Sequence, residues 1–159
     1  MDEETSAQQT KGRILVTIQF VLLGWLILLP TTLGSWGAAS DPMLAIGLAL
    51  MVLAVVLVTA GFLALSSTLS VMPTPRQNGQ LKTNGIFKLV RHPIYSGLMC
   101  VALGLICIDG FATAGLPSLL LFIVLNVKAR FEEKLLGQKY PDYSQYMQRV
   151  GRFFPRLFR

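Results

Sequence analysis

Hydrophobic and polar positions divide this chain into long blocks. The runs without a charged residue cover residues 14–40, 42–75, 93–108 and 110–127. A helix that crosses a membrane needs roughly 20 apolar residues, so each of the first two runs is long enough to hold one. The last two runs are shorter, and together they predict a tight helical hairpin that turns near Asp109 and Gly110.

The pattern predicts an all-α fold, a polytopic membrane bundle of four transmembrane helices over about residues 14–36, 43–70, 93–109 and 113–136. The fourth helix is expected to extend past Val127, with the side chains of Lys128 and Arg130 snorkelling toward the membrane boundary. Residues 1–12 are expected to form a disordered tail, which leaves residues 13–159 as a single domain.

Composition and charge agree with a membrane protein. Only 14% of the residues are charged, whereas soluble domains carry about 25%. The Lys and Arg residues lie in three places: the N-terminal tail, residues 76–91 and residues 128–159. Four spans put these places on one side, which the positive-inside rule makes cytoplasmic. We therefore expect an integral, multi-pass membrane protein with both termini and the active site in the cytoplasm, and no nucleic-acid partner.

Two segments outside the predicted spans have a pattern of their own. Residues 72–92 form a long connection with turn signals at Pro73, Pro75 and Gly79. Its apolar residues argue against disorder, so we expect a functional loop. Residues 141–150 are predicted to form a short basic and aromatic helix at the membrane surface. A lid over the site and a simple interfacial anchor are both open interpretations of this helix.

Arg91-His92-Pro93 precedes the third span. Pro93 fits the first position of a helix, and the free N–H groups of that turn favour an anion, as do the side chains of Arg91 and His92. The other interpretation is that Arg91 is a positive-inside residue in contact with lipid phosphate. The two cysteines have no metal-ligand spacing with the histidine, so no metal site is predicted.

Glu132 and Glu133 lie at the end of the fourth span. Adjacent residues of a helix point about 100° apart, so at most one of these carboxylates is expected to face the bundle interior. An acidic residue at membrane depth indicates function by default, although an ordinary helix end in solvent is the alternative. Asn126 lies one turn before Arg130 on the same face. The hairpin brings this cluster and the Arg91 cluster to one membrane face, where a zwitterionic ligand with an amino-acid end would satisfy both.

The C-terminal half of the chain carries a set of short motifs. They are Gly85-x-Phe87, Arg91-His92-Pro93-x-Tyr95, Glu132-Glu133-x-x-Leu136, Tyr140-x-x-Tyr143-x-x-Tyr146 and Arg152-Phe153-x-Pro155. This set resembles the isoprenylcysteine carboxyl methyltransferases and their relatives, the membrane phospholipid methyltransferases. The resemblance covers the chain from Leu81 onward, and its most specific part is the pairing of Arg-His-Pro-x-Tyr with Glu-Glu-x-x-Leu.

The resemblance implies a methyltransferase that holds S-adenosylmethionine, the methyl donor, in a cytoplasmic pocket over the last two spans. The cofactor-binding residues that it implies are Gly79, Gln80, Leu81, Lys82, Phe87, His92, Pro93, Ile94, Tyr95 and Glu133. Either Glu133 or Glu132 would meet the charged amino-acid end of the donor. Asn126 and Arg130 would lie on the route to the acceptor and, with Glu132, are the candidate catalytic residues. The chain departs from the family pattern at Phe87, where Tyr is usual, and at Gly79, near a His of the eukaryotic carboxyl methyltransferases.

The chemistry of the acceptor leaves alternatives open. A carboxylate needs no base, and Arg130 or Arg91 could orient it. An ammonium group must first lose a proton, for which Glu132, Glu133 or His92 are candidate bases. We expect a lipophilic acceptor taken from the lipid bilayer: a prenylated cysteine, as in a carboxyl O-methyltransferase, or the ethanolamine head group of a phospholipid. A non-enzymatic membrane scaffold is a further alternative, and the oligomeric state is left open.

Overall fold

The computed structural model describes residues 2–28, 36, 39–65 and 81–156. The regular elements in these residues are α1 (Asp2–Leu28), α2 (Ser40–Leu65), the short 3-10 helix η2 (Gly85–Lys88), α3 (Pro93–Asp109), α4 (Phe111–Lys139) and α5 (Tyr143–Arg149). The predicted all-α class is confirmed, because the described residues form helices and a single isolated β-bridge.

Among the described residues, three helical segments are long and apolar enough to cross a membrane: Ser6–Leu28, Ser40–Leu65 and Ala112–Lys139. The predicted third span coincides with α3, which has 17 residues. A helix of this length is about 25 Å long, somewhat less than the roughly 30 Å of a bilayer core. The count of four spans therefore stays a prediction. Residues 29–35 and 66–70 of the predicted spans lie outside the described residues.

The N-terminal tail differs from its prediction. α1 begins at Asp2, so the described part of residues 1–12 is helical rather than disordered. The Glu, Ala and Gln residues of this stretch have favourable helix propensities. The hydroxyl of Thr10 also donates to the carbonyl of Ser6 at 2.9 Å. These polar turns thus continue the apolar helix outward.

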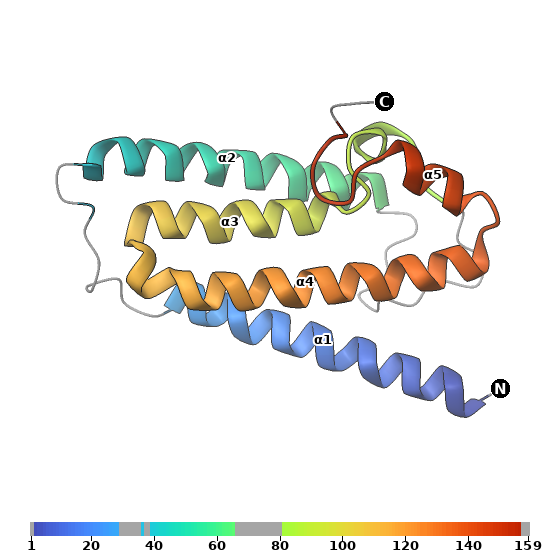
Figure 1. The fold of residues 1–159 in the computed structure, drawn as a ribbon. Helices are drawn as coiled ribbons and strands as arrows, with labels where there is room; N and C mark the ends of the chain where they lie inside the picture. The colour runs from blue at the N-terminus through green and yellow to red at the C-terminus, as the bar shows by residue number, and fades with distance from the viewer. Residues whose placement is uncertain (1, 29–35, 37–38, 66–80, 157–159) are drawn as a thin grey trace.

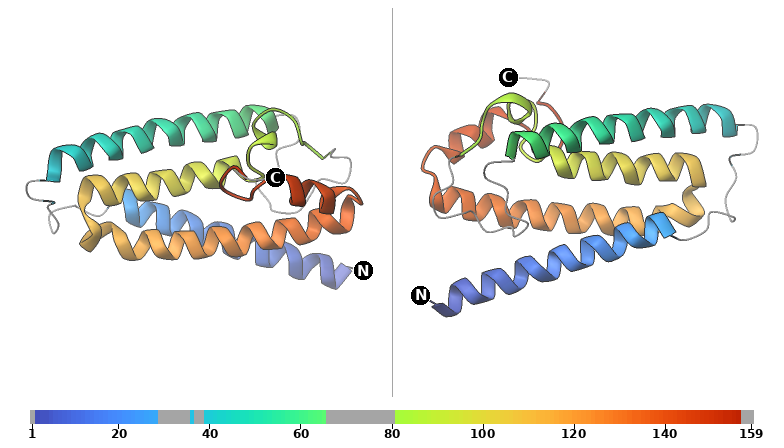
Figure 2. Two further views of the ribbon diagram at one scale, coloured as in Figure 1. Left: turned by 45° about the horizontal axis from the view of Figure 1, so that its top comes forward. Right: turned by 180° about the vertical axis from the view of Figure 1, so that it is seen from behind.

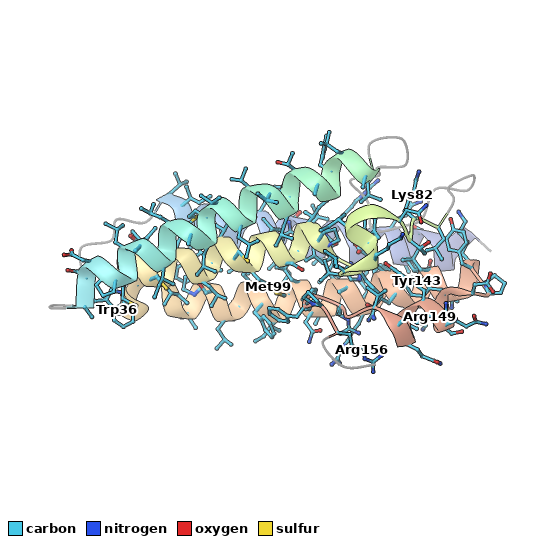
Figure 3. All side chains as sticks on the ribbon, turned by 90° about the horizontal axis from the view of Figure 1, so that it is seen from above. Trp36, Lys82, Met99, Tyr143, Arg149 and Arg156 are labelled. Carbon is cyan, nitrogen blue, oxygen red and sulfur yellow. The ribbon has the colours of Figure 1, made fainter. Side chains whose placement is uncertain are left out.

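The long helices lie side by side in a fixed order. α3 packs between α2 and α4, and α1 packs on the opposite side of α4 (Figures 1 and 2). The start of α1, the end of α4 and α5 all lie at one end of the bundle (Figure 1). Figure 3 shows Lys82, Tyr143 and Arg149 at this end, with Trp36 at the other. We call it the polar end.

α2 and α3 approach closely through small residues. The buried residues of α2 are Gly47, Ala54 and Gly61, spaced seven apart, and the first two face glycines of α3. A Cβ atom on Gly97 would lie 3.0 Å from the carbonyl oxygen of Ala54, and one on Gly104 would lie 3.1 Å from that of Gly47. Small residues at such positions let membrane helices pack backbone to backbone.

Large apolar side chains cover the outer faces of α1 and α2. Val21, Val55 and Leu63 are 64%, 66% and 66% exposed. Soluble proteins rarely expose contiguous apolar surface on this scale. Such a surface is suited to contact with the hydrocarbon tails of membrane lipids.

The predicted hairpin is present. α3 ends at Asp109, and α4 begins at Phe111. The single residue between them, Gly110, has a φ of 90°, a conformation that glycine adopts without steric cost. α4 is longer than α3, so its last turns project beyond Pro93, and the chain folds back there through α5 (Figure 1).

Candidate active site

The first turn of α3 forms the centre of the polar end. Pro93 is at the first helical position and is buried, as predicted, because its missing N–H has no intrahelical partner there. His92 precedes it as the N-cap residue without a capping side-chain hydrogen bond. The imidazole is therefore available to other partners, and it points toward α4.

Glu133 is the hub of the cluster and is 6% exposed. Arg91 donates from Nε and Nη2 to its Oε1 at 3.0 and 2.8 Å. Arg152 donates from Nη2 to Oε2 at 2.6 Å, and its Nε lies 3.0 and 3.1 Å from the two oxygens. His92 Nε2 lies 3.3 Å from Oε1. Two guanidinium groups and an imidazole therefore compensate this buried carboxylate.

Glu132 also reaches the interior, which contradicts the prediction that at most one of the two carboxylates does. Its Oε1 accepts a hydrogen bond from the hydroxyl of Tyr95 at 2.5 Å, and its Oε2 lies 3.6 Å from His92 Nδ1. The ring of His92 lies between the two carboxylates, so adjacent residues that point about 100° apart both contact it. A neutral imidazole has one N–H and can donate to only one of them at a time.

The segment after α5 pairs with the start of α3. Val90 and Gly151 form a parallel β-bridge, and the N–H groups of Arg91 and His92 donate to the carbonyls of Gly151 and Arg152 at 2.9 and 3.0 Å. A Cβ atom on Gly151 would clash with the carbonyl oxygen of Phe154 at 1.9 Å, so this turn requires glycine. The pairing holds Arg152 against Glu133.

α5 packs over the connection that leads into α3. The hydroxyl of Tyr146 donates to the carbonyl of Phe87 at 2.6 Å. Burial raises the pKa of Tyr146 to about 12, which keeps this hydroxyl a donor at neutral pH. The Nη1 atom of Arg91 donates to the carbonyls of Met147, at 3.0 Å, and Val150. These contacts favour the interpretation of α5 as a cover for the site over that of an anchor alone.

Five of the predicted site residues form one cluster at the polar end. His92, Tyr95, Glu132 and Glu133 contact one another directly. Asn126 joins them because its Oδ1 accepts a hydrogen bond from Arg152 Nη1 at 2.8 Å.

The remaining predicted residues lie outside this cluster. Phe87 is buried under α5, Leu81 and Lys82 are half-buried, and Ile94 packs against Gly61 of α2. Gly79 and Gln80 lie outside the described residues.

Arg130 is not brought to the cluster. Its side chain is exposed and lines a groove of about 500 Å³ between α1 and α4, together with Lys11 and Lys134. Asn126 is partly buried and faces Arg152 instead. Residues four apart share a helix face only approximately, since four residues turn the helix by about 400°, and here that difference separates the two side chains.

Comparison with known proteins identifies the family. The model of the family described as phospholipid methyltransferase matches residues 42–143. The chain belongs to this family. The matched residues contain Arg91, His92, Tyr95, Glu132 and Glu133, which are the contacts between α3 and α4.

Individual relatives match over shorter stretches. The cobalt-zinc-cadmium resistance protein CzcN of Cupriavidus metallidurans is 30% identical over 86 residues, which are 52% of this chain and 38% of the relative. The nickel-cobalt-cadmium resistance protein NccN of Alcaligenes xylosoxydans is 28% identical over 86 residues, 52% of this chain and 39% of the relative. An uncharacterised protein of Schizosaccharomyces pombe is 33% identical over 79 residues, 46% of this chain and 23% of the relative. The chain thus spans under two fifths of the length of these curated relatives.

Sequence reasoning missed two positions of this phospholipid methyltransferase family member. Arg152 was part of a recognised motif, Arg-Phe-x-Pro, but nothing in the sequence indicated that the chain would fold back to bring it to Glu133. Lys128 was expected to snorkel, yet it is 6% exposed. Its ammonium donates to Gln19 Oε1 at 2.8 Å, because α1 lies alongside and supplies an acceptor at that depth.

An apolar cavity of about 510 Å³ lies between α3 and α4. Its lining includes Met99, Phe122 and, from the C-terminal segment, Phe154. Asn126 follows Phe122 by one helical turn on the same face. Among the residues that line the cavity, Phe122 is thus the one on α4 nearest in sequence to Asn126, and Phe154 lies two residues after Arg152.

Proposed function

We propose that this protein is an integral membrane methyltransferase that uses S-adenosylmethionine to methylate a lipophilic acceptor, with the site at the cytoplasmic face. The observation that carries the proposal is the convergence of Arg91, His92 and Tyr95 with Glu132 and Glu133 at one end of the bundle. The family membership supports the same conclusion. The basic ends of the helices gather at the polar end (Figure 1), which the positive-inside rule favours as the cytoplasmic side.

The residues at the polar end fit the donor molecule. The backbone N–H groups in the first turn of an α-helix have no intrahelical partner, so the start of α3 suits a carboxylate. Glu132 offers a carboxylate that suits an ammonium group. Phe87 and Ile94 offer apolar surface for a nucleoside. When bound, S-adenosylmethionine supplies a methyl group already activated on a sulfonium, so the protein mainly has to position the reactants and exclude water.

Between the two candidate carboxylates, we assign the ammonium end of the donor to Glu132. Both oxygens of Glu133 already accept hydrogen bonds from guanidinium groups, and a new cation would have to displace one of them. Among the described residues, Glu132 accepts a hydrogen bond from Tyr95 alone, and its second oxygen lies 3.6 Å from His92. A carboxylate with unused acceptor positions is the better partner for an incoming ammonium.

This assignment favours a carboxylate as the acceptor, as in an isoprenylcysteine carboxyl O-methyltransferase. An amine acceptor needs a base. Of the three candidates, Glu133 is engaged by Arg91 and Arg152, Glu132 would hold the donor, and the ring of His92 lies between these two carboxylates. A carboxylate needs orientation only, which Arg152, 28% exposed at its side chain, could provide next to Asn126. The apolar cavity lined by Phe122, four residues before Asn126 on α4, suits a hydrocarbon tail. The family description favours the second candidate, N-methylation of a phospholipid head group.

Calorimetry with S-adenosylhomocysteine tests donor binding. The detergent-solubilised protein should bind it, and Glu132→Gln should weaken binding by about tenfold or more, because a hydrogen bond to a charged group contributes about 1.5–3 kcal/mol. Lys134→Met, an exposed change on the same helix, is the control and should bind as the wild type does. A folded wild-type protein without detectable binding would contradict the proposal.

A labelling experiment separates the two acceptors. Membranes that contain the protein are incubated with donor carrying a labelled methyl group, and the lipid-soluble product is treated with mild base. A carboxyl methyl ester loses its label, whereas a methylated amine keeps it. Retention of the label would favour the phospholipid head group instead.

A further inference from the structure

A second group of polar side chains lies on the α1 side of the site. Lys128 is buried within the membrane-length part of α4, and its ammonium donates to Gln19 of α1, which is 7% exposed. Charged side chains at this depth are costly and indicate function by default. The proposed reaction, as described above, makes no use of Lys128.

Lys128 connects to the candidate donor site through Tyr95. The ammonium lies 4.9 Å from the centroid of the Tyr95 ring, within the range of a cation–π interaction. The hydroxyl of the same ring donates to Glu132. Lys128 and Glu132 are also four residues apart on α4, a spacing at which opposite charges attract. Gln19, Lys128, Tyr95 and Glu132 therefore form one continuous series of contacts from α1 to the donor site.

We propose that Lys128, held in place by Gln19, is a positioning residue for Glu132. Its ammonium fixes the ring of Tyr95, whose hydroxyl holds the Glu132 carboxylate toward the ammonium end of the donor, and its charge supports the negative charge of Glu132 in an apolar surrounding. This inference rests on the proposed function. It makes α1 a working part of the site, although α1 lies outside the residues that the family model matches.

A purely structural role would leave the choice of lysine unexplained. In the described part of the chain, no carboxylate oxygen lies within 4.0 Å of the Lys128 ammonium. A buried charge without a close counter-ion is a poor way to dock two helices, because a well-packed apolar pair is commonly as stable or more stable. The Lys128 ammonium lies over the Tyr95 ring and one helical turn from Glu132, and this position explains why a charged residue is found there.

The test compares two ligands in Lys128→Met. S-adenosylhomocysteine carries the amino-acid end, and 5′-methylthioadenosine has the same nucleoside without it. We expect calorimetry to show about tenfold weaker binding of S-adenosylhomocysteine, because Glu132 loses its charged hydrogen bond to the ammonium group of this ligand. The affinity for 5′-methylthioadenosine should be unchanged. An unchanged affinity for 5′-methylthioadenosine also shows that the variant is folded. Equal weakening of both ligands would mean a structural role and overturn the proposal.

A double-mutant cycle tests whether Lys128 acts through Glu132. In the Glu132→Gln background, Lys128→Met should cause no further loss of S-adenosylhomocysteine affinity, since residues that act through one another are not additive. Losses that simply multiply would overturn the inference. Lys134→Met should leave both affinities unchanged and controls for the removal of a positive charge from α4.

A milder variant keeps the inference testable should Lys128→Met fail to fold. Gln19→Leu leaves the lysine in place and removes only its hydrogen-bond acceptor. We expect a smaller loss, about threefold, again confined to S-adenosylhomocysteine and absent in the Glu132→Gln background. No change would overturn the role of Gln19. A wild-type protein that binds neither ligand would instead contradict the proposed function itself.

Discussion

The two sides of α3 are held by different kinds of contact. Toward α2, its glycines meet small residues, and the helices touch backbone to backbone. Toward α4, its first turn is held by the carboxylates of Glu132 and Glu133 with their cationic and hydroxyl partners. Gly61 of α2 packs directly against Pro93 and Ile94, so both kinds of contact converge on the same turn.

The small-residue contact toward α2 holds the helices together, whereas the charged contact toward α4 gives the site its chemistry. Between membrane helices the lipid is as apolar as the side chains, so close packing of small residues supplies much of the association. That contact depends on shape alone, and it places the first turn of α3 without adding any reactive group. The charged contact is directional, and it fixes each side chain because a buried charge without a partner is costly. Close packing thus sets the position of the helix, and charge sets the geometry of the site.

Removing the hub of the charged side should have the largest effect. Glu133→Leu leaves the two guanidinium groups of Arg91 and Arg152 without their shared carboxylate, and breaking a buried ion pair from one partner costs about 3–5 kcal/mol. Denaturant unfolding in detergent, followed by circular dichroism, measures the loss. Lys134→Met, the exposed neighbour, should change the free energy of unfolding by less than about 0.5 kcal/mol. A Glu133→Leu variant as stable as this control would show that the cluster does not hold the bundle.

The small-residue side should respond less strongly. A Cβ atom on Gly97 would lie 2.6 Å from Cγ2 of Val58 and 3.0 Å from a backbone oxygen, so Gly97→Ala must push α2 away from α3. Overpacking of this kind costs about 1–3 kcal/mol. Gly24→Ala is the matched control, because nothing lies within 4 Å of a Cβ atom there, and it should stabilise α1 by about 0.5–1 kcal/mol. Equal effects of the two substitutions in the same unfolding assay would contradict the close packing.

Much of the fold could be read from the sequence because long apolar runs have few structural options in a membrane. The bounds of α3 and the turn at Gly110 follow from Pro93, from Asp109 and from the uncharged residues between them. The helical state of residues 2–12 is not predicted, because polar composition favours disorder although the Glu, Ala, Gln and Lys residues of the stretch are good helix formers. Whether a polar stretch continues an apolar helix depends on that helix, which composition alone does not reveal.

The sequence predicts which site residues lie together only where these residues are neighbours in sequence or belong to the hairpin of α3 and α4. His92, Tyr95, Glu132 and Glu133 share the hairpin, so their proximity follows from its short turn. Arg152 reaches Glu133 through the backbone pairing at Gly151, a tertiary contact without a local signal. Lys128 was assigned to the membrane boundary because snorkelling is the usual behaviour of lysine near a helix end. Its partner Gln19 lies 109 residues away in sequence, and no pattern links the two.

The smallest expected effect concerns the cover that α5 forms over the connection into α3. Tyr146→Phe removes the hydrogen bond to the carbonyl of Phe87, which should cost about 0.5–1.5 kcal/mol. The loss should be local, so amide hydrogen exchange at Leu89 and Val90, whose N–H groups donate to the carbonyl of Ile86, should accelerate about fivefold, as expected for 1 kcal/mol.

The pH dependence of this exchange distinguishes the hydroxyl from a general loosening of α5. Because the pKa of Tyr146 is raised to about 12 by burial, the hydroxyl donates throughout the range from about pH 6 to 9. The ratio of variant to wild-type exchange should therefore stay constant over that range. Ser144→Ala, an exposed change on the same helix, should leave the exchange rates unaltered. Were it to accelerate exchange as much as Tyr146→Phe does, α5 would be loosely attached, and the interpretation as an anchor would be preferred.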